Sequence, residues 1–204
     1  WRPQEHLIMV ASDTYWNREE TALERVVFLP VEDDATMYYM YLSGEIDWAT
    51  DVPSGYLDEA RLRDDYHATP QLATYYFVFQ TEKVPLDDWR VRKALSTAVD
   101  REQLVRTVTR AGEIPAFSIV PPMTGYPGIE GNPEDVTVAR QLLADAGYPR
   151  GDGFPPLTLV YNTNERHKAI GEFIQQQWLE NLGVDVTLEN QEWGCMATKE
   201  NRNT

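Results

Sequence analysis

Four polar side chains that could contact a ligand lie close together in the segment YNTNERHK, residues 161–168. Asn162, Thr163 and Asn164 directly follow the apolar stretch LTLVY, and His167 comes three residues later. Amides donate and accept hydrogen bonds, and so does a neutral imidazole, so this combination suits recognition of a polar guest. Asn is also a common turn residue, and His167 could equally be an exposed surface histidine. The segment therefore predicts a binding surface, with turn formation as the alternative.

Motifs of catalysis are missing from the rest of the sequence. It contains no glycine-rich phosphate loop, no dinucleotide-binding fingerprint and no Gly-x-Ser-x-Gly nucleophile elbow. The single cysteine, Cys195, excludes an internal disulfide and a multi-cysteine zinc site. His6, His67 and His167 are far apart and lack the spacing of metal ligands. We therefore expect no catalytic residues, no metal, no cofactor and no enzyme activity.

The charge balance limits the partners. Among 204 residues, 33 are acidic and 18 are basic, which gives a formal net charge of −15. Binding to nucleic acid depends on cationic neutralisation of phosphates, so this balance argues against a nucleic-acid partner, and equally against an anionic membrane surface. No apolar run approaches the roughly 20 residues that a membrane span needs. The chain begins at Trp1 and ends in the polar string TKENRNT, so we expect an internal piece of a longer protein.

The polar segment lies inside a predicted strand–helix–strand unit. LTLVY, residues 157–161, has the composition of a strand, and Asn164 can cap a helix that ends at Gly183. In residues 184–190 apolar and polar positions alternate, as in a half-buried strand. Such a unit predicts two parallel strands with a right-handed connection. Ligands bind at the carboxyl edge of open α/β sheets, and Asn162 is predicted to lie there. The apolar face of the helix would consist of Ile170, Phe173, Ile174 and Trp178.

Other elements follow from periodicity and capping residues. The predicted strands are residues 6–12, 25–31, 45–50 and 74–81, of which the last is the strongest. Two predicted helices are residues 33–44 and residues 53–66. A third is capped by Asp87 and has a buried stripe of Val91, Ala94, Leu95 and Ala98, and a fourth runs from Asp100 to Gly112. A fifth is capped by Asn132, ends at Gly147 and has a buried stripe of Val138, Ala139, Leu142, Leu143 and Ala146. Tyr38, Tyr39 and Tyr41 have helical spacing and are expected to pack rather than to form a stacking platform.

Four separated segments resemble the periplasmic oligopeptide-binding proteins of bacterial ABC importers, which belong to solute-binding protein family 5. They are LDDWRVRKALSTAVDREQLV, IPAFSIVPP, ARQLLADAGYP and LVYNTNERHKAIGEFIQQQWLENLGVDVTLENQEW, in the family's order. The resemblance implies an α/β fold of the periplasmic binding protein type II-like class, with two lobes joined by a hinge and present here only in part. Residues 1–73 would be part of the amino-terminal lobe and residues 74–204 the first part of the carboxy-terminal lobe, with the hinge crossover near residues 70–75.

The resemblance also implies a function. The protein would be the extracytoplasmic solute-binding component of an ABC transporter, capturing oligopeptides for import. Its partners would be an oligopeptide ligand and an ABC permease in the inner membrane. It would be periplasmic, or extracytoplasmic and lipid-anchored, and a monomer when full length. The alternatives are a binding protein for dipeptides, cell-wall peptides or another small solute, or an enzyme or regulatory interaction domain on the same scaffold.

Individual site residues carry over by position. Asn162 and His167 match polar residues that face the pockets for peptide side chains. Trp193, after NQE, matches an aromatic residue at the cleft, with a core residue as the alternative, and Tyr76 matches a tyrosine near the ligand. The family's aspartate for the peptide amino terminus would lie beyond Thr204. The expected substrate-binding residues are therefore Tyr76, Asn162, His167 and Trp193.

Overall fold

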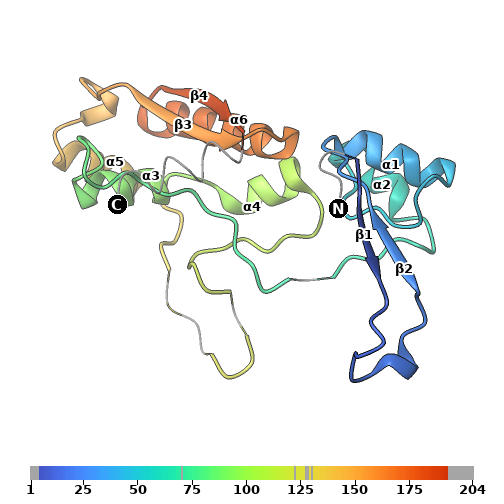
Figure 1. Ribbon diagram of the computed structural model, residues 1–204. Coiled ribbons are helices and arrows are strands. Elements are labelled where there is room, and N and C mark those ends of the chain that lie inside the picture. The colour runs from blue at the N-terminus through green and yellow to red at the C-terminus, as the bar shows by residue number, and fades with distance from the viewer. Residues whose placement is uncertain (1–4, 70, 122, 127–128, 130, 193–204) are drawn as a thin grey trace. The chain divides into compact units, whose positions relative to one another are not determined.

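The computed structural model describes residues 5–69, 71–121, 123–126, 129 and 131–192 (Figure 1). The chain forms two compact units, Trp1–Tyr56 and Leu57–Thr204, which are described separately as unit 1 and unit 2. The boundary predicted after residue 73 divides the two lobes of the complete protein rather than the compact units of this chain, and it stays a prediction. Within the described residues, no helix combines the length and the apolar character that crossing a membrane requires.

The described residues of unit 1 contain a two-stranded antiparallel ribbon and one α-helix. Strand β1 (Leu7–Val10) pairs with β2 (Arg25–Phe28), and a 3-10 turn (Arg18–Glu20) lies in the connection. Helix α1 (Asp34–Ser43) begins where the Asp33 carboxylate accepts the Thr36 N–H at 2.7 Å and ends at Gly44 in the left-handed region. Both predicted strands and the predicted helix over residues 33–44 are confirmed.

Two predictions for the end of unit 1 are wrong. Residues 45–50 form bends and irregular backbone instead of a strand, because they have no ladder partner among the described residues. The helix predicted over residues 53–66 is reduced to a 3-10 turn (Ser54–Tyr56) and α2 (Leu57–Ala60), which belongs to unit 2. The tyrosines of α1 do pack: Tyr38 is buried, and its ring lies 5.5 Å from that of Tyr56.

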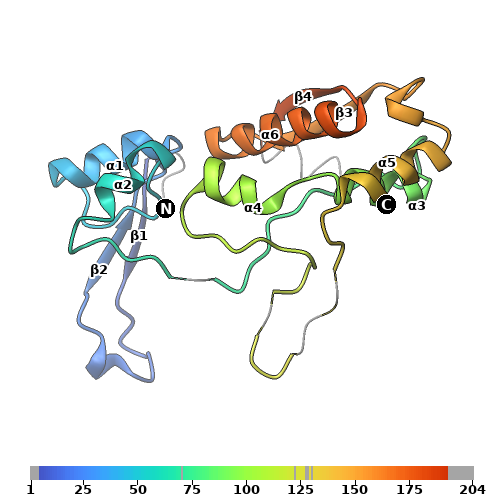
Figure 2. The same ribbon diagram turned by 180° about the vertical axis from the view of Figure 1, so that it is seen from behind.

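The strand–helix–strand unit of unit 2 is confirmed. Strands β3 (Leu157–Asn162) and β4 (Val186–Gln191) are parallel and are joined by α6 (Glu165–Leu182). The strands lie in front of α6 in Figure 1, and α6 lies in front of them in the reverse view of Figure 2, so the helix covers one face of this sheet. Asn164 caps α6, and Gly183 ends it with φ 72°.

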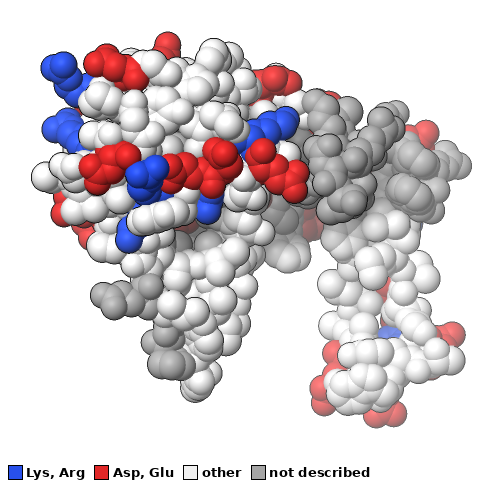
Figure 3. Space-filling model, turned by 90° about the vertical axis from the view of Figure 1, so that its left-hand side faces the viewer, with Lys and Arg blue, Asp and Glu red and all other residues white. Residues whose placement is uncertain are grey.

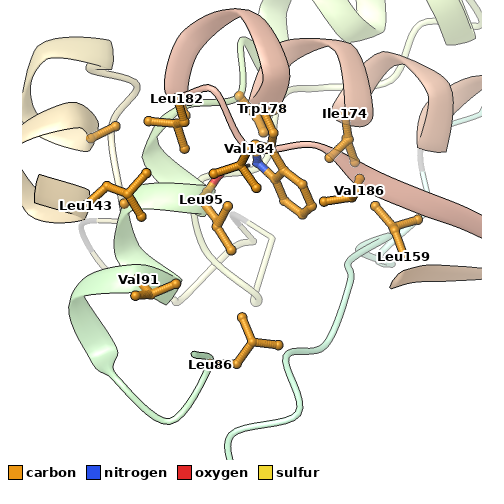
Figure 4. Packing of buried hydrophobic residues seen from close by; sticks show 14 of the residues in the cluster. Leu86, Val91, Leu95, Leu143, Leu159, Ile174, Trp178, Leu182, Val184 and Val186 are labelled. Carbon is orange, nitrogen blue, oxygen red and sulfur yellow. Dashed lines mark hydrogen bonds between the residues drawn. The ribbon is translucent and has the colours of Figure 1, made fainter. Parts of the chain in front are cut away.

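The core of unit 2 lies between this layer and helices α3 (Trp89–Thr97) and α5 (Val136–Asp145). The predicted stripe on α3 is fully buried: Val91, Ala94, Leu95 and Ala98. Trp178 of α6 packs against this helix, and its indole Nε1 donates to the Leu95 carbonyl at 2.8 Å (Figure 4). On α5, Ala139 and Leu143 are buried as predicted, but Val138 is exposed, contrary to the prediction.

Residues 74–81 do not form the predicted strand. No ladder partner for them exists in the part of the chain that the structure describes, and a strand requires one. Their side chains still alternate: Phe77 and Phe79 pack against the core, whereas Tyr76 and Val78 are exposed. The period-two pattern therefore reports correctly which side of the segment is apolar, although it does not yield a paired strand.

The ends of α3 and α4 differ from the predictions. The cap of α3 is Asp88, not Asp87. Asp100 caps α4 (Arg101–Leu104) as predicted, but the helix continues as a π-helical turn (Val105–Thr109) and ends at Arg110 with φ 59°, before Gly112.

The cap of α5 is Asp135 rather than Asn132. The Asp135 backbone N–H donates to the Thr97 carbonyl at 3.1 Å. One residue earlier, the Glu134 carboxylate accepts the Arg101 backbone N–H at 2.5 Å. These two bonds to distant parts of the chain keep residues 132–134 outside the helix, so its first turn begins three residues later than the sequence predicts.

We expect Glu134→Gln to change how stability depends on pH. Burial raises the pKa of Glu134, so folding favours the protonated acid. A raised folded pKa gives a contribution that is full below the unfolded pKa and is lost as pH rises. Wild type should therefore lose stability relative to Glu134→Gln as the pH rises above the ordinary pKa of a glutamate, about 4.

Chemical denaturation at a series of pH values measures this difference. The exposed Glu172→Gln on α6 is the control. If the curves of wild type and Glu134→Gln ran parallel across these pH values, burial of Glu134 would have no consequence for stability.

Charges of both signs are interspersed on the molecular face shown in Figure 3, where Lys and Arg lie among Asp and Glu. The excess acidity is thus not gathered into a single acidic patch on this face.

Candidate ligand-binding site

The carboxyl end of β3 is extended by hydrogen bonds beyond its last ladder pair. Asn162 lies opposite Gln191 in the register. The next residue, Thr163, donates its backbone N–H to the Gln191 carbonyl at 3.0 Å, and its hydroxyl accepts from Asn190 Nδ2 at 3.4 Å. The turn from strand to helix is therefore held against the end of β4.

Asn164 then starts α6 without any intervening loop. Its Oδ1 accepts the backbone N–H groups of Arg166 at 2.8 Å and His167 at 3.2 Å. These bonds satisfy N–H groups that lack partners in the first turn of a helix. The turn between strand and helix is consequently short, and His167 lies in the first turn of α6, close to the strand end.

Asn162 and His167 contact each other directly. His167 Nδ1 and Asn162 Oδ1 are 2.5 Å apart, and both side chains are half-buried. An amide oxygen only accepts, so Nδ1 of His167 donates this hydrogen bond. The site thus combines the Asn162 amide with an imidazole in a defined orientation, which is chemistry for hydrogen bonding to a polar guest.

Tyr75 is the site residue that sequence reasoning missed. Its ring stacks on that of His167, with centroids 4.8 Å apart and planes at 26°. Its other neighbour is Phe77, in an edge-to-face contact at 5.5 Å. Burial raises the pKa of Tyr75. A signal was present in the sequence: Tyr75 has the same parity as Phe77 and Phe79, which pack against the core.

The other two predicted site residues are placed differently. Tyr76 is exposed, and so is Val78; these two residues alternate with Phe77 and Phe79, which pack against the core. The residue that stacks on His167 is the preceding one, Tyr75. Trp193 lies outside the described residues. The roles of Tyr76 and Trp193 as ligand contacts therefore stay predictions.

Two cavities of unit 2 lie away from this site. One, of about 140 Å³, is lined by Thr97, Ala98, Val99, Asp100, Glu134, Asp135, Val136 and Gln177. The other, of about 380 Å³, is at the amino-terminal ends of β3 and β4 and is lined by Gly151, Phe154, Pro155, Pro156, Leu157, Gly183, Asp185, Val186 and Thr187. Neither is lined by Asn162 or His167, so these two cavities are separate from the site at the end of β3. Among the described residues, no three His, Cys, Asp or Glu side chains are grouped to hold a metal ion.

Comparison with protein families gives a match over the whole chain. The model of the bacterial extracellular solute-binding proteins, family 5 (middle), matches residues 1–204. The chain is 38% identical over 200 residues to the periplasmic murein peptide-binding protein MppA of Escherichia coli, covering 93% of this chain and 37% of that protein. It is 35% identical over 209 residues to the periplasmic oligopeptide-binding protein OppA of Escherichia coli, covering 95% and 37%.

Solved structures show the same likeness. A periplasmic oligopeptide-binding protein of Borrelia burgdorferi has a TM-score of 0.88 and 36% identity, over 98% of this chain and 41% of that one. The murein tripeptide-binding protein of Escherichia coli has a TM-score of 0.84 and 34% identity, over 98% and 41%. These matches confirm the expected α/β fold class. The chain spans about two fifths of the length of the proteins it matches.

Proposed function

The chain belongs to the bacterial extracellular solute-binding proteins of family 5, and we propose that it forms one wall of a cleft that captures oligopeptides for import. The observation that carries this proposal is the direct contact of Asn162 with His167 at the carboxyl end of β3. In open α/β sheets this edge is where ligands bind. The chain spans about two fifths of its relatives, so the opposite wall would come from sequence outside these 204 residues.

An extended peptide offers unpaired backbone N–H and C=O groups, which a cleft can pair without reading side chains. Asn162 and His167 would face a peptide side chain directly or through a bridging water, and Tyr76 and Trp193 would contribute aromatic surface. Bridging water can fill gaps between a peptide side chain and the cleft, so such a cleft would accept peptides of many sequences.

The wider assignment follows from the same membership. Ligand binding would close two lobes about a hinge near residues 70–75, and an ABC permease would recognise the closed form. The protein would act in the periplasm or another extracytoplasmic compartment and would not be an enzyme. Relatives named for binding murein peptides, oligopeptides and dipeptides support a peptide ligand.

Calorimetric titration of the complete gene product with tri- to pentapeptides tests this function. We expect saturable binding of several unrelated sequences. Binding of dipeptides or murein peptides alone would favour the narrower alternative, and silence across the whole peptide set would overturn the proposal. The isolated 204-residue chain, tested beside it, is expected to bind weakly or not at all.

Asn162→Ala in the complete gene product is expected to weaken peptide affinity roughly tenfold, the equivalent of one hydrogen bond together with the lost orientation of His167. Thr158→Ala is the matched control, because Thr158 is an exposed residue of the same strand and has the same parity as Asn162, four residues away. The dissociation constants come from the same calorimetric titrations. Equal affinities for the two variants would place the peptide away from the end of β3.

A further inference from the structure

We propose that Tyr75 is a positioning residue that fixes the imidazole of His167 and thereby sets which peptide side chains the site prefers. The preference for particular side chains rests on the proposed function, whereas the positioning itself rests on the geometry of unit 2 alone. The carrying observation is the stack of the two rings, 4.8 Å between centroids and 26° between planes.

The imidazole is held from three directions. Asn162 Oδ1 accepts a hydrogen bond from Nδ1 at 2.5 Å, which fixes the rotation of the ring. The backbone N–H of His167 is bound to the Asn164 cap, which fixes the start of the side chain. Tyr75 covers one of the two ring faces. A guest therefore meets an imidazole whose orientation is already set by Asn162, Asn164 and Tyr75.

Tyr75 is itself fixed to the core. Its ring meets the edge of Phe77 at 5.5 Å and 86°, and both Phe77 and Phe79 pack against the hydrophobic core. Aromatic pairs in this offset or edge-to-face geometry stabilise each other beyond the area that they bury. Contacts therefore run without a break from the core to the end of β3, through Phe77, Tyr75, His167 and Asn162 in turn.

This chain of contacts explains how a half-exposed histidine can be selective. A histidine at the surface samples several rotamers, and a hydrogen bond from a mobile ring gives little discrimination. A ring fixed in one orientation raises the affinity for a ligand group that is placed to hydrogen-bond with it, and lowers the affinity for a group that is not. Because Tyr75 fixes the His167 ring, we expect the site to bind peptides with a polar side chain at this position more tightly than peptides with an aliphatic one.

The test uses Tyr75→Leu and Tyr75→Phe in the complete gene product. The ring protons of His167 are observed by NMR without ligand, because a stacked aromatic ring shifts them upfield. Affinities are measured by calorimetry for a set of Ala-Xaa-Ala tripeptides in which only the central residue varies. Trp89→Leu is the control, since Trp89 is 57% exposed and Tyr75 is 51% exposed.

Tyr75→Leu is expected to abolish the upfield shift and to reduce the preference for polar over aliphatic central residues roughly two- to tenfold. Tyr75→Phe should keep both, because the ring and not the hydroxyl makes the stack. Trp89→Leu should change neither.

Two results would overturn the inference: wild-type His167 protons without an upfield shift, or Tyr75→Leu binding the tripeptide set with unchanged preference. Failure of the proposed function is recognised separately. In that case wild type binds none of the peptides, whatever the NMR spectrum shows.

Discussion

Replacing Trp178 by alanine is expected to lower the free energy of unfolding of the unit that contains it by about 3–5 kcal/mol, the usual cost of removing a large aromatic residue from a core. Trp178 is only 6% exposed and packs among Leu95, Ile174 and Val184 (Figure 4). Its Nε1 also satisfies the Leu95 carbonyl in a buried hydrogen bond. The substitution would therefore leave a cavity and remove a hydrogen bond at the contact of α6 with α3.

Chemical denaturation of the complete gene product, followed by circular dichroism, measures this loss. The adjacent Leu179→Ala is the control, because Leu179 is 50% exposed on the same helix and should cost less than about 1 kcal/mol. Trp178→Phe should fall between the two, since it keeps most of the buried ring and loses only the hydrogen bond and part of the volume. A similar loss for Trp178→Ala and Leu179→Ala would show that α6 is not held to α3 by this side chain.

Gly183→Ala is expected to cost about 3 kcal/mol or more, the sum of a left-handed backbone and a steric overlap. Gly183 ends α6 with φ 72°, where an L side chain is strained by roughly 1–2 kcal/mol. A Cβ at this position would also overlap the carbonyl oxygen of Arg150. The overlap is reciprocal, because a Cβ added at Gly151 would overlap the carbonyl oxygen of Gly183. Two backbone segments therefore touch here, and neither can move away as a flexible side chain would.

Gly147→Ala separates the two effects. Gly147 follows α5 with φ 100°, and a Cβ there would meet open space. Its substitution should show the conformational cost alone, about 1–2 kcal/mol. Denaturation midpoints of the two variants, measured side by side, give the difference. Equal losses would mean that the turn Pro149–Gly151 yields to the added methyl group and that the close approach has no energetic weight.

Local sequence determined the elements that carry their own signals. The period of apolar residues identified the buried face of α3, and the side chains of Asp33, Asp100 and Asn164 marked helix starts where each can reach an N–H two or three residues ahead. The strand–helix–strand unit was predicted for the same reason: its periodicity, cap and terminal glycine all lie within 34 residues, 157 to 190. The proximity of Asn162 to His167 followed from the same unit, because the short turn between β3 and α6 keeps these two side chains close together.

Tertiary structure decided what depends on distant partners. A strand exists only if another strand pairs with it, so the apolar alternation of residues 74–81 and the composition of residues 45–50 could not by themselves produce one. The start of α5 was set by bonds from Asp135 to Thr97 and from Glu134 to Arg101, which no local pattern encodes. Likewise, Tyr75 rather than Tyr76 reached His167 because Phe77 and Phe79 fixed which side of the segment turns to the core.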